Sequence, residues 1–231
     1  MNIIFITGTD TDAGKTMLSL LVMHALHGRD AVYLKPVQTG CSDPDTDSDP
    51  AFVHRHLPDG LPTTPAQAIH ACRVPPKAPL FAGEPVDFQA AVNFVLAHAA
   101  WYSWTVVEGA GGVLVPVTSE KTMLDLALET KASILVAGRA GLGTINHTLL
   151  TLEAIRARQG SCLGVFLLDP DDATPEAERN ENIRAISGIS GFPVHGVIGR
   201  IDNPLHCSIV TARGSCLNHP TSREATNPTG W

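Results

Sequence analysis

Short runs of hydrophobic, often β-branched residues alternate along the chain with longer segments in which hydrophobic residues recur every three or four positions. The short runs predict buried strands at residues 3–7, 31–34, 105–107, 133–137, 163–168 and 194–198. The longer segments predict helices at residues 15–27, 86–99, 123–129, 144–158 and 175–186. This alternation is typical of a mostly parallel sheet covered by helices on both faces. The sequence therefore predicts an α/β protein.

Two stretches interrupt the alternation. Residues 41–85 are rich in proline and carry an acidic run, made up of Asp43, Asp45, Asp47 and Asp49. A connection of this length in a compact domain is usually functional or disordered. Residues 202–231 are rich in Pro, Asn, Ser and Thr and have almost no periodicity, which predicts an irregular tail. We therefore expect one domain over residues 1–201 and a C-terminal tail over residues 202–231.

Composition narrows the class of protein. With 231 residues, 44% of them hydrophobic, the chain can bury one large core. Its formal net charge is −7 and it has no cluster of Lys and Arg, which argues against a nucleic-acid partner or a membrane surface. The five cysteines lack CxxC spacing, and we find no signal segment or long hydrophobic run. These features predict reduced thiols in a cytoplasmic protein.

The segment GTDTDAGKT, residues 8–16, directly follows the first predicted strand and precedes the first predicted helix. A glycine-bounded loop in that context brings backbone N–H groups and a helix N-terminus to one anion. Lys15 would reach the β and γ phosphates of a nucleoside triphosphate, and the Thr16 hydroxyl would bind Mg²⁺. The alternative is an ordinary turn with a solvent-facing lysine. Because the loop is one residue longer than the standard one, it indicates a particular branch of these enzymes.

Charged residues also follow two other predicted strands. Lys35 comes after the second and Glu108 after the third, so both would lie at the edge of the sheet where ligands bind. Lys35 could stabilise charge on a transferred phosphoryl group, or it could be solvated. Glu108 could hold Mg²⁺, or it could cap a glycine turn at residues 109–112. Asp10 and Asp12 would repel phosphate, which favours a positively charged second substrate.

Four motifs, taken in order along the chain, resemble those of the dethiobiotin synthetase family. They are residues 8–16 (GTDTDAGKT), 35–40 (KPVQTG), 108–112 (EGAGG) with Val115-Pro116, and 143–147 (GTINH). The resemblance implies a homodimer with a three-layer P-loop NTPase fold and a mostly parallel sheet of about seven strands. It also implies closure of the ureido ring of 7,8-diaminopelargonate with CO₂ and ATP, with Mg²⁺ as the cofactor.

Members of this family form a carbamate from a substrate amine and CO₂, and the carbamate attacks the γ-phosphate before the second amine closes the ring. The resemblance implies catalytic roles for Thr11, Lys15 and Lys35. Nucleotide or substrate contacts would come from Asp12, Ala13, Gly14, Lys15, Thr16, Thr39, Glu108, Gly109, Ala110, Gly111 and, across the dimer, Asn146. Mg²⁺ would be held by Thr16, Asp49 and Glu108, with Asp47 as a rival of Asp49. The two charged amines of the substrate would account for the acidic loop that carries Asp10 and Asp12, whereas most aspartates of the acidic run would be solvated.

The C-terminal third departs from the family pattern. Leu168-Asp169 stands where the family commonly has Asn-Asp to read adenine, and Ile198-Gly199 stands where Ile-Pro is expected. Leucine cannot make the paired hydrogen bonds of an amide. We therefore expect other nucleoside triphosphates to support turnover comparably to ATP.

Three other interpretations stay open at this point. An amidating ligase of the cobyrinate type shares the longer loop but normally carries a glutaminase domain, for which the chain has no room. A nucleotide switch of the chromosome-partition or septum-placement kind carries an extra lysine where this chain has Asp10. A nucleotide-binding relative without synthetase activity would fit the altered C-terminal third.

Overall fold

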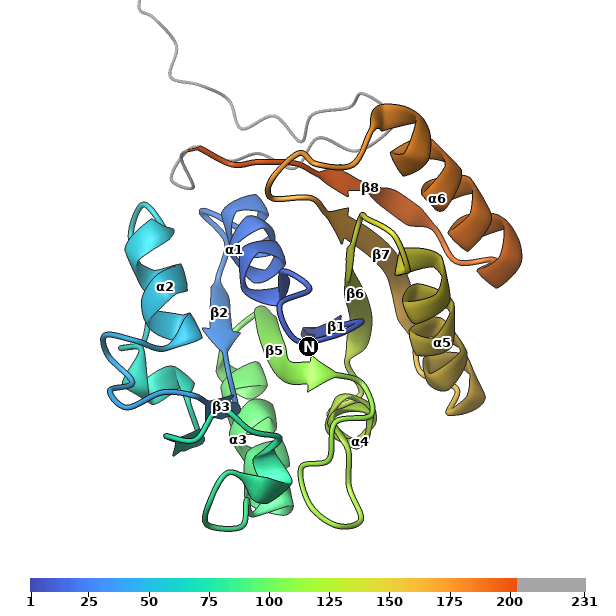
Figure 1. Ribbon diagram of the computed structural model, residues 1–231. Coiled ribbons are helices and arrows are strands. Elements are labelled where there is room, and N and C mark those ends of the chain that lie inside the picture. The colour runs from blue at the N-terminus through green and yellow to red at the C-terminus, as the bar shows by residue number, and fades with distance from the viewer. Residues whose placement is uncertain (203–231) are drawn as a thin grey trace, which may run out of the picture.

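The computed structural model describes residues 1–202 and is built around one parallel sheet (Figure 1). This sheet has six strands in the order β2-β5-β1-β6-β7-β8, and all neighbouring strands are parallel. The strands are β1 (Asn2–Gly8), β2 (Ala31–Leu34), β5 (Trp104–Gly112), β6 (Ser133–Arg139), β7 (Cys162–Leu168) and β8 (Val194–Ile198). The α/β class and the mostly parallel sheet are confirmed, although the described residues place six strands in it where about seven were expected.

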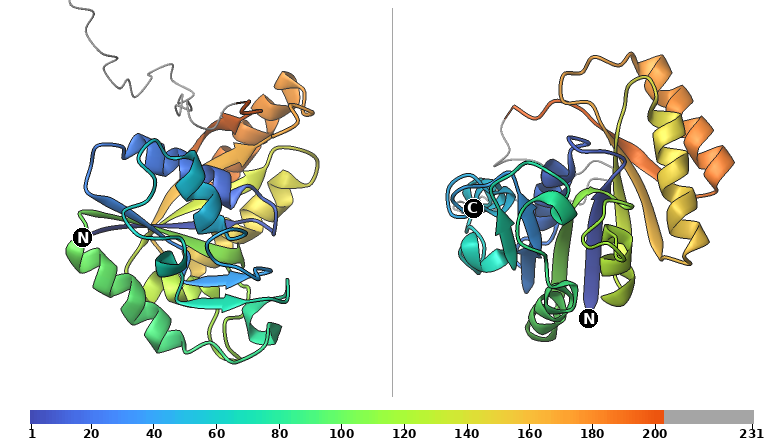
Figure 2. Two further views of the ribbon diagram at one scale, coloured as in Figure 1. Left: turned by 90° about the vertical axis from the view of Figure 1, so that its left-hand side faces the viewer. Right: turned by 60° about the horizontal axis from the view of Figure 1, so that its bottom comes forward.

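Helices cover both faces of the sheet and produce three layers (Figure 2). One face carries α1 (Lys15–Ala25) and α2 (Asp49–His56). The other face carries α3 (Phe88–Trp101), α4 (Met123–Glu129), α5 (Thr144–Ala157) and α6 (Glu176–Ser190). A hydrophobic cluster lies under each helical layer, so the sheet is buried on both sides as its continuous hydrophobic runs require.

Every strand and helix that the hydrophobic pattern predicts is present, with ends that differ by a few residues. One difference affects the site. β5 continues through Gly112, so Glu108 is a strand residue opposite Ile6 of β1. A Cβ on Gly109 would lie 2.9 Å from the ring of Phe5, so glycine lets the backbone of β5 approach this side chain closely. The glycine segment that Glu108 might have capped is therefore part of β5, with an irregularity at Gly111, whose φ is +67°.

The proline-rich segment is ordered and adds elements that the pattern did not predict. β3 (Val37–Thr39) and β4 (Ala71–Arg73) form a separate two-stranded parallel sheet, and α2 lies between them in sequence. Short 3-10 helices cover Ala66–Ala68 and Pro79–Phe81. These elements span too few residues to show a hydrophobic period, and contacts with the rest of the protein stabilise them.

Residues 203–231 lie outside the described part of the chain, so the expected tail is described only at Asp202. Within residues 1–202, no helix combines the length and the hydrophobicity that a membrane crossing requires.

Candidate nucleotide and substrate site

The loop between β1 and α1 folds back on itself at the carboxyl edge of the sheet. Gly14 has a φ of +87° and immediately precedes Lys15, the first residue of α1. The Lys15 ammonium donates to the backbone carbonyl of Asp10 at 3.1 Å. A Cβ on Gly8 would lie 2.5 Å from that same carbonyl oxygen, so the loop closes only over a glycine. The predicted arrangement of strand, glycine-bounded loop and helix is confirmed.

Lys15 lies beside other charged groups and is buried. Burial lowers its pKa, the ammonium of Lys35 lowers it further, and the carboxylates of Glu108 and Asp49 act in the opposite direction. The alternative of a solvent-facing lysine is therefore wrong. Lys15 is thus a buried lysine at the N-terminus of α1, a position where the helix dipole favours an anion.

Glu108 is buried and accepts hydrogen bonds at both of its carboxylate oxygens. Thr16 and Lys35 donate to Oε1, each at 2.9 Å. Ser19 and Tyr33 donate to Oε2, at 2.8 and 2.7 Å respectively. The sequence did not point to Ser19 or Tyr33. Their spacing from predicted site residues was the available signal. Ser19 lies one helical turn after Thr16, on the same face of the helix, and Tyr33 lies two residues before Lys35, on the same side of the extended chain.

Lys35 lies between two carboxylates. Its ammonium is 2.9 Å from Glu108 Oε1 and 2.7 Å from Asp49 Oδ2, and it donates to the Gly109 carbonyl at 3.0 Å. Burial by itself would lower the pKa of Lys35, but Glu108 and Asp49 outweigh burial and raise the pKa above its usual value. The alternative of a solvated lysine is therefore wrong, and the side chain is a buried, permanent cation.

The acidic run divides between the site and its own loop. Asp49 faces Lys35, whereas Asp47 accepts hydrogen bonds from the Cys41 thiol and the Ser42 backbone, each at 3.0 Å. The Cys41 contact and then the Ser42 contact hold the pKa of Asp47 well below its usual range. The other two aspartates bind backbone N–H groups of the same segment. Three carboxylates of the run therefore accept hydrogen bonds within the segment, and Asp49 faces the site.

Asp10 is also used differently from the expectation. Its carboxylate lies 2.7 Å from the guanidinium of Arg139, at the end of β6, and Arg139 also donates to the Thr11 carbonyl. Asp10 is thus neutralised by a cation of the protein itself. Sequence reasoning missed this pair because 129 positions separate its members and no local pattern links them.

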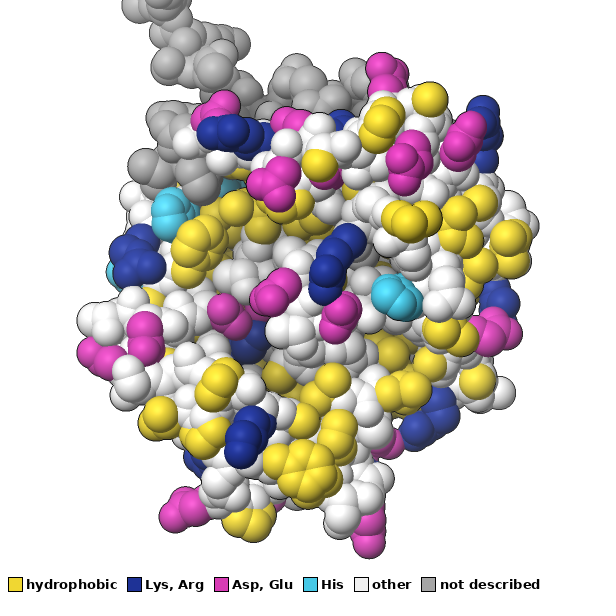
Figure 3. Space-filling view, viewed as in Figure 1, with side chains coloured by type: hydrophobic (Ala, Val, Ile, Leu, Met, Phe, Trp, Pro, Cys, Tyr) yellow, Lys and Arg dark blue, Asp and Glu magenta, His cyan; other side chains and the backbone are white. Residues whose placement is uncertain are grey.

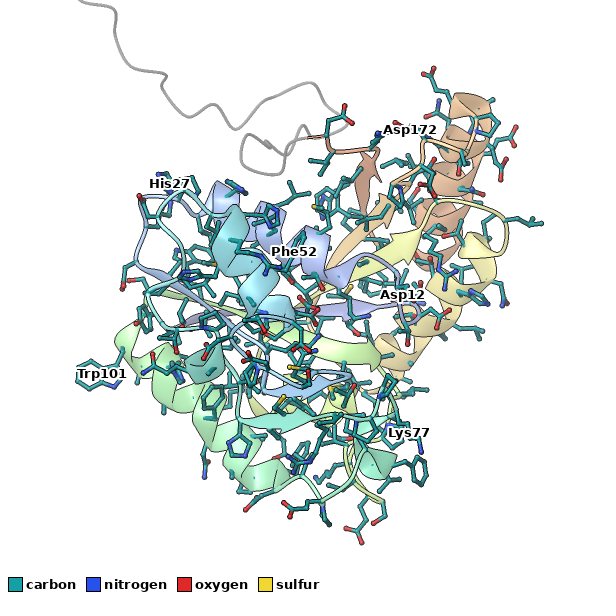
Figure 4. All side chains as sticks on the ribbon, turned by 60° about the vertical axis from the view of Figure 1, so that its left-hand side comes forward. Asp12, His27, Phe52, Lys77, Trp101 and Asp172 are labelled. Carbon is teal, nitrogen blue, oxygen red and sulfur yellow. The ribbon has the colours of Figure 1, made fainter. Side chains whose placement is uncertain are left out.

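A cleft of about 600 Å³ joins these groups. On the face shown in Figure 3, acidic and basic side chains gather around a central hollow. Asp12 and Lys77 come from loops far apart in sequence, yet both line the cleft (Figure 4). The expected site residues that line it are Thr11, Asp12, Gly14, Lys15, Thr16, Lys35, Thr39, Asp49, Glu108, Ala110 and Gly111, together with Asp47, the rival of Asp49.

Three expected site residues do not line this cleft. Ala13 is buried and lines a neighbouring cavity. Gly109 lies behind Lys35 and accepts its hydrogen bond. Asn146 is exposed on the first turn of α5 and is not brought to the two lysines by this chain.

A second cavity, of about 710 Å³, lies beside the phosphate loop and shares Asp12 and Gly14 with the cleft. Leu168 forms part of its wall and packs closely on the phosphate loop at Gly14. A Cβ at Gly14 would collide with Leu168 Cδ2, so only glycine fits there. Among the described residues that line the cavity there is no asparagine or glutamine. A nucleotide base placed here would therefore meet a leucine side chain where the family pattern has an amide.

The carboxylate of Asp169, also in this cavity, is turned toward its own loop. It accepts from the backbone N–H of Thr174 at 2.9 Å and from Arg179 at 2.7 Å. A Cβ on Gly199 would lie 2.4 Å from a carboxylate oxygen of Asp172, so glycine at this position leaves room for the loop. The neighbouring side chains thus accommodate both departures from the family pattern, Leu168-Asp169 and Ile198-Gly199.

The donors near the phosphate loop fit Mg²⁺. Thr16, Asp49 and Glu108 supply hard oxygen ligands, and Asp49 lies close enough to interact with both of the other side chains. Within residues 1–202, no cluster of three or more His, Cys, Asp or Glu residues forms a complete metal cage. A small number of protein oxygens matches the way Mg²⁺ is held jointly by carboxylates, water and nucleotide phosphates.

The parallel sheet, the glycine-bounded loop before α1 and the two lysines beside it define a P-loop NTPase, and a family model described as an AAA domain matches residues 2–203. The chain is 41% identical to the ATP-dependent dethiobiotin synthetase of Anaeromyxobacter sp. (strain Fw109-5), over 81% of this chain and 85% of that one. It is 39% identical to the enzyme of the same name from Rhodopseudomonas palustris (strain HaA2), over 76% and 78% of the two chains. The chain belongs to the dethiobiotin synthetase family.

The fold is also similar to that of a ParA family ATPase from Chlorobium tepidum TLS, with a TM-score of 0.53 over 87% of this chain and 85% of that one. The two sequences are 12% identical, so this likeness concerns the fold alone. The alternative of a nucleotide switch requires an extra lysine at position 10, where this chain has Asp10 paired with Arg139.

Proposed function

We propose that this protein closes the ureido ring of 7,8-diaminopelargonate, using CO₂ and a nucleoside triphosphate, through a carbamate and a carbamic-phosphoric anhydride. Lys15 binds the phosphates, Lys35 holds the γ-phosphate and the carbamate, and Thr11 and Thr39 line the diamine site. Mg²⁺, held by Thr16, Asp49 and Glu108, supplies neutralisation of phosphate charge when bound. The reaction takes place in the cytoplasm.

One observation carries the proposal. Lys35 is buried between Glu108 and Asp49, beside Lys15, in a cleft that opens at the phosphate loop. Phosphoryl transfer to a carbamate places negative charge on both the transferred group and the attacking oxygen. A buried lysine whose pKa is raised stays cationic at that point, and its charge acts in a region of low dielectric constant.

The shape of the site also suits a diamine with a hydrocarbon tail. A hollow of about 410 Å³ adjoins the cleft at Thr11 and Val115, and is lined mainly by hydrophobic side chains. The two amines of the substrate would lie in the cleft and its hydrocarbon chain in the hollow, and its distal carboxylate would meet Asn146 across the dimer.

The direct test is to mix the purified protein with Mg-ATP, bicarbonate and 7,8-diaminopelargonate. We expect ADP release that depends on the diamine, together with a product of the mass of dethiobiotin. Tight nucleotide binding without this product would contradict the proposal and favour a different amine substrate or a non-catalytic relative.

We expect the identity of the base to matter little. The cavity beside the phosphate loop presents Leu168 and an Asp169 that is already bound to Arg179, so base-specific hydrogen bonds to side chains are few. ATP, GTP, CTP and UTP should therefore differ in kcat/KM by less than about tenfold, which corresponds to about 1.4 kcal/mol. Release of the nucleoside diphosphate at fixed diamine concentration measures this. A preference for ATP of several hundredfold would refute relaxed base recognition.

A homodimer that uses α5 is part of the proposal. Asn146 and Leu150, four residues apart on one face of α5, are exposed, as is Leu142 just before the helix. A second copy on this face would cover these leucines and bring Asn146 to the neighbouring site. Sedimentation equilibrium should therefore give twice the mass of the chain, and Leu150→Asp should shift it to the monomer. A wild-type monomer at micromolar concentration would contradict this arrangement.

A further inference from the structure

Glu108 is held from two opposite directions by donors of different kinds. Thr16 and Lys35, which donate to Oε1, both line the cleft. Ser19 and Tyr33, which donate to Oε2, are fully buried and do not line the cleft. The carboxylate therefore has one oxygen turned to the ligand space and one turned to the core.

The two buried donors come from different elements. Ser19 lies on α1 and Tyr33 on β2, the strand that pairs directly with β5. Tyr33 is among the largest fully buried side chains of the described chain, so its ring has no room to turn its hydroxyl elsewhere. A hydrogen bond of 2.7 Å from such a ring fixes the position of the oxygen that receives it.

We infer that Tyr33 is a positioning residue which, together with Ser19, holds Oε2 of Glu108 in the core and leaves Oε1 alone to face the cation. This inference rests on the proposed metal role of Glu108. With metal and nucleotide bound, Thr16 and Lys35 would serve the metal and the phosphates and would no longer hold Oε1, whereas Oε2 would keep both of its donors. The carboxylate then stays in place without the contacts that hold it on the cleft side.

The physical basis is the cost of a wrongly oriented ligand. Groups that hydrogen-bond to a metal ligand set its orientation, and their removal typically lowers metal affinity by 10- to 100-fold. With the hydroxyl of Tyr33 removed, Oε2 keeps one donor, and the carboxylate can rotate toward a geometry in which both oxygens compete for Lys35. Packing in the core would be nearly unchanged, because phenylalanine has the same ring.

The chain provides a matched control, since Tyr33 and Tyr102 are its two tyrosines. Tyr102 follows α3 and packs against the hydrophobic cluster on that face of the sheet, whereas Tyr33 belongs to the cluster on the other face. We would measure Mn²⁺ binding by electron paramagnetic resonance in the presence of saturating ADP, without diamine or turnover. Tyr33→Phe is expected to weaken Mn²⁺ binding about tenfold, and Tyr102→Phe to leave it unchanged. Ser19→Ala, which removes the other donor to Oε2, should act in the same direction as Tyr33→Phe.

Glu108→Gln in the same assay separates the positioning role of Tyr33 and Ser19 from the metal role of Glu108. If Glu108→Gln weakens Mn²⁺ binding and neither Tyr33→Phe nor Ser19→Ala does, the positioning role is wrong and the metal role of Glu108 stands. If Glu108→Gln has no effect either, the metal role fails as well. A fall in melting temperature for Tyr33→Phe with unchanged Mn²⁺ affinity would make the hydrogen bond a packing feature only. Should Tyr33→Phe not fold, the Ser19→Ala result decides.

Discussion

Replacing Lys35 by alanine is expected to lower kcat by about a hundredfold or more while leaving the dissociation constant for nucleotide nearly unchanged. The reason is that the ammonium, held 2.7 Å from Asp49 and 2.9 Å from Glu108, acts where charge develops in the transition state, whereas Lys15 and the backbone loop bind the ground-state phosphates. Diamine-dependent ADP release gives kcat, and calorimetric titration with ADP gives the dissociation constant.

The structure adds a second consequence of the same change. Without the ammonium of Lys35, the buried carboxylate of Glu108 and the half-buried carboxylate of Asp49 lose the cation that lies between them, and breaking a fully buried ion pair in this way costs about 3–5 kcal/mol. The metal-free variant should therefore melt at a lower temperature, and added Mg²⁺ should restore part of the loss. Lys121→Ala, at a lysine that pairs with Glu129 on the surface, is the control and should leave both kcat and nucleotide affinity unchanged.

Lys35→Met replaces the lysine with a neutral side chain of similar length, and so keeps the measurement possible if Lys35→Ala does not fold. Equal losses of nucleotide affinity and kcat in both variants would show that Lys35 is a structural residue of the nucleotide site. That result would also remove the main support for the proposed reaction.

Replacing Glu108 by glutamine should raise the Mg²⁺ concentration needed for half-maximal activity by about tenfold or more. A neutral amide is a weaker ligand for a hard cation than a carboxylate. Whichever way the amide is turned, its NH₂ group cannot accept the hydrogen bonds that one of the two carboxylate oxygens now receives. The measurement is a Mg²⁺ titration of ADP release at saturating diamine and nucleotide.

Two aspartates of the proline-rich segment serve as a matched pair for this experiment. Asp49→Asn should also raise the Mg²⁺ requirement, because Asp49 faces Lys35 in the cleft. Asp47→Asn should leave the requirement unchanged and instead destabilise the loop that its carboxylate holds together through Ser42 and Cys41. An unchanged requirement in Glu108→Gln would exclude Glu108 from the metal site, and a raised one in Asp47→Asn would contradict the assignment of Asp49.

Much of the framework of the site could be predicted from the sequence. Hydrophobic periodicity located every strand of the main sheet, and the rule that ligands bind at the carboxyl ends of parallel strands singled out Lys35 and Glu108. These predictions succeed because strand and helix formation depend on residues that are neighbours in the chain. The roles of the individual site residues stay predictions until the variants are measured.

In the proline-rich segment, the sequence could not decide which aspartate belongs to the site. Asp47 and Asp49 are two residues apart and chemically identical, so no local pattern separates them. In the structure Ser48 is the N-cap of α2, and its hydroxyl accepts from the Ala51 N–H. Asp47 therefore lies before the helix and Asp49 in its first turn, so their carboxylates have different neighbours. Only Asp49 then meets Lys35.

The sequence by itself thus determined the class of fold, the order of its elements, the phosphate loop and the family resemblance, because these depend on local patterns and on motifs that are continuous in the chain. Only the tertiary structure decided which charges meet: Arg139 with Asp10, Lys35 with both Asp49 and Glu108, and the buried hydroxyl of Tyr33 with Glu108. The physical reason is that ion pairs and hydrogen bonds act over about 3 Å, and the packing of the sheet and its helices sets which residues come that close.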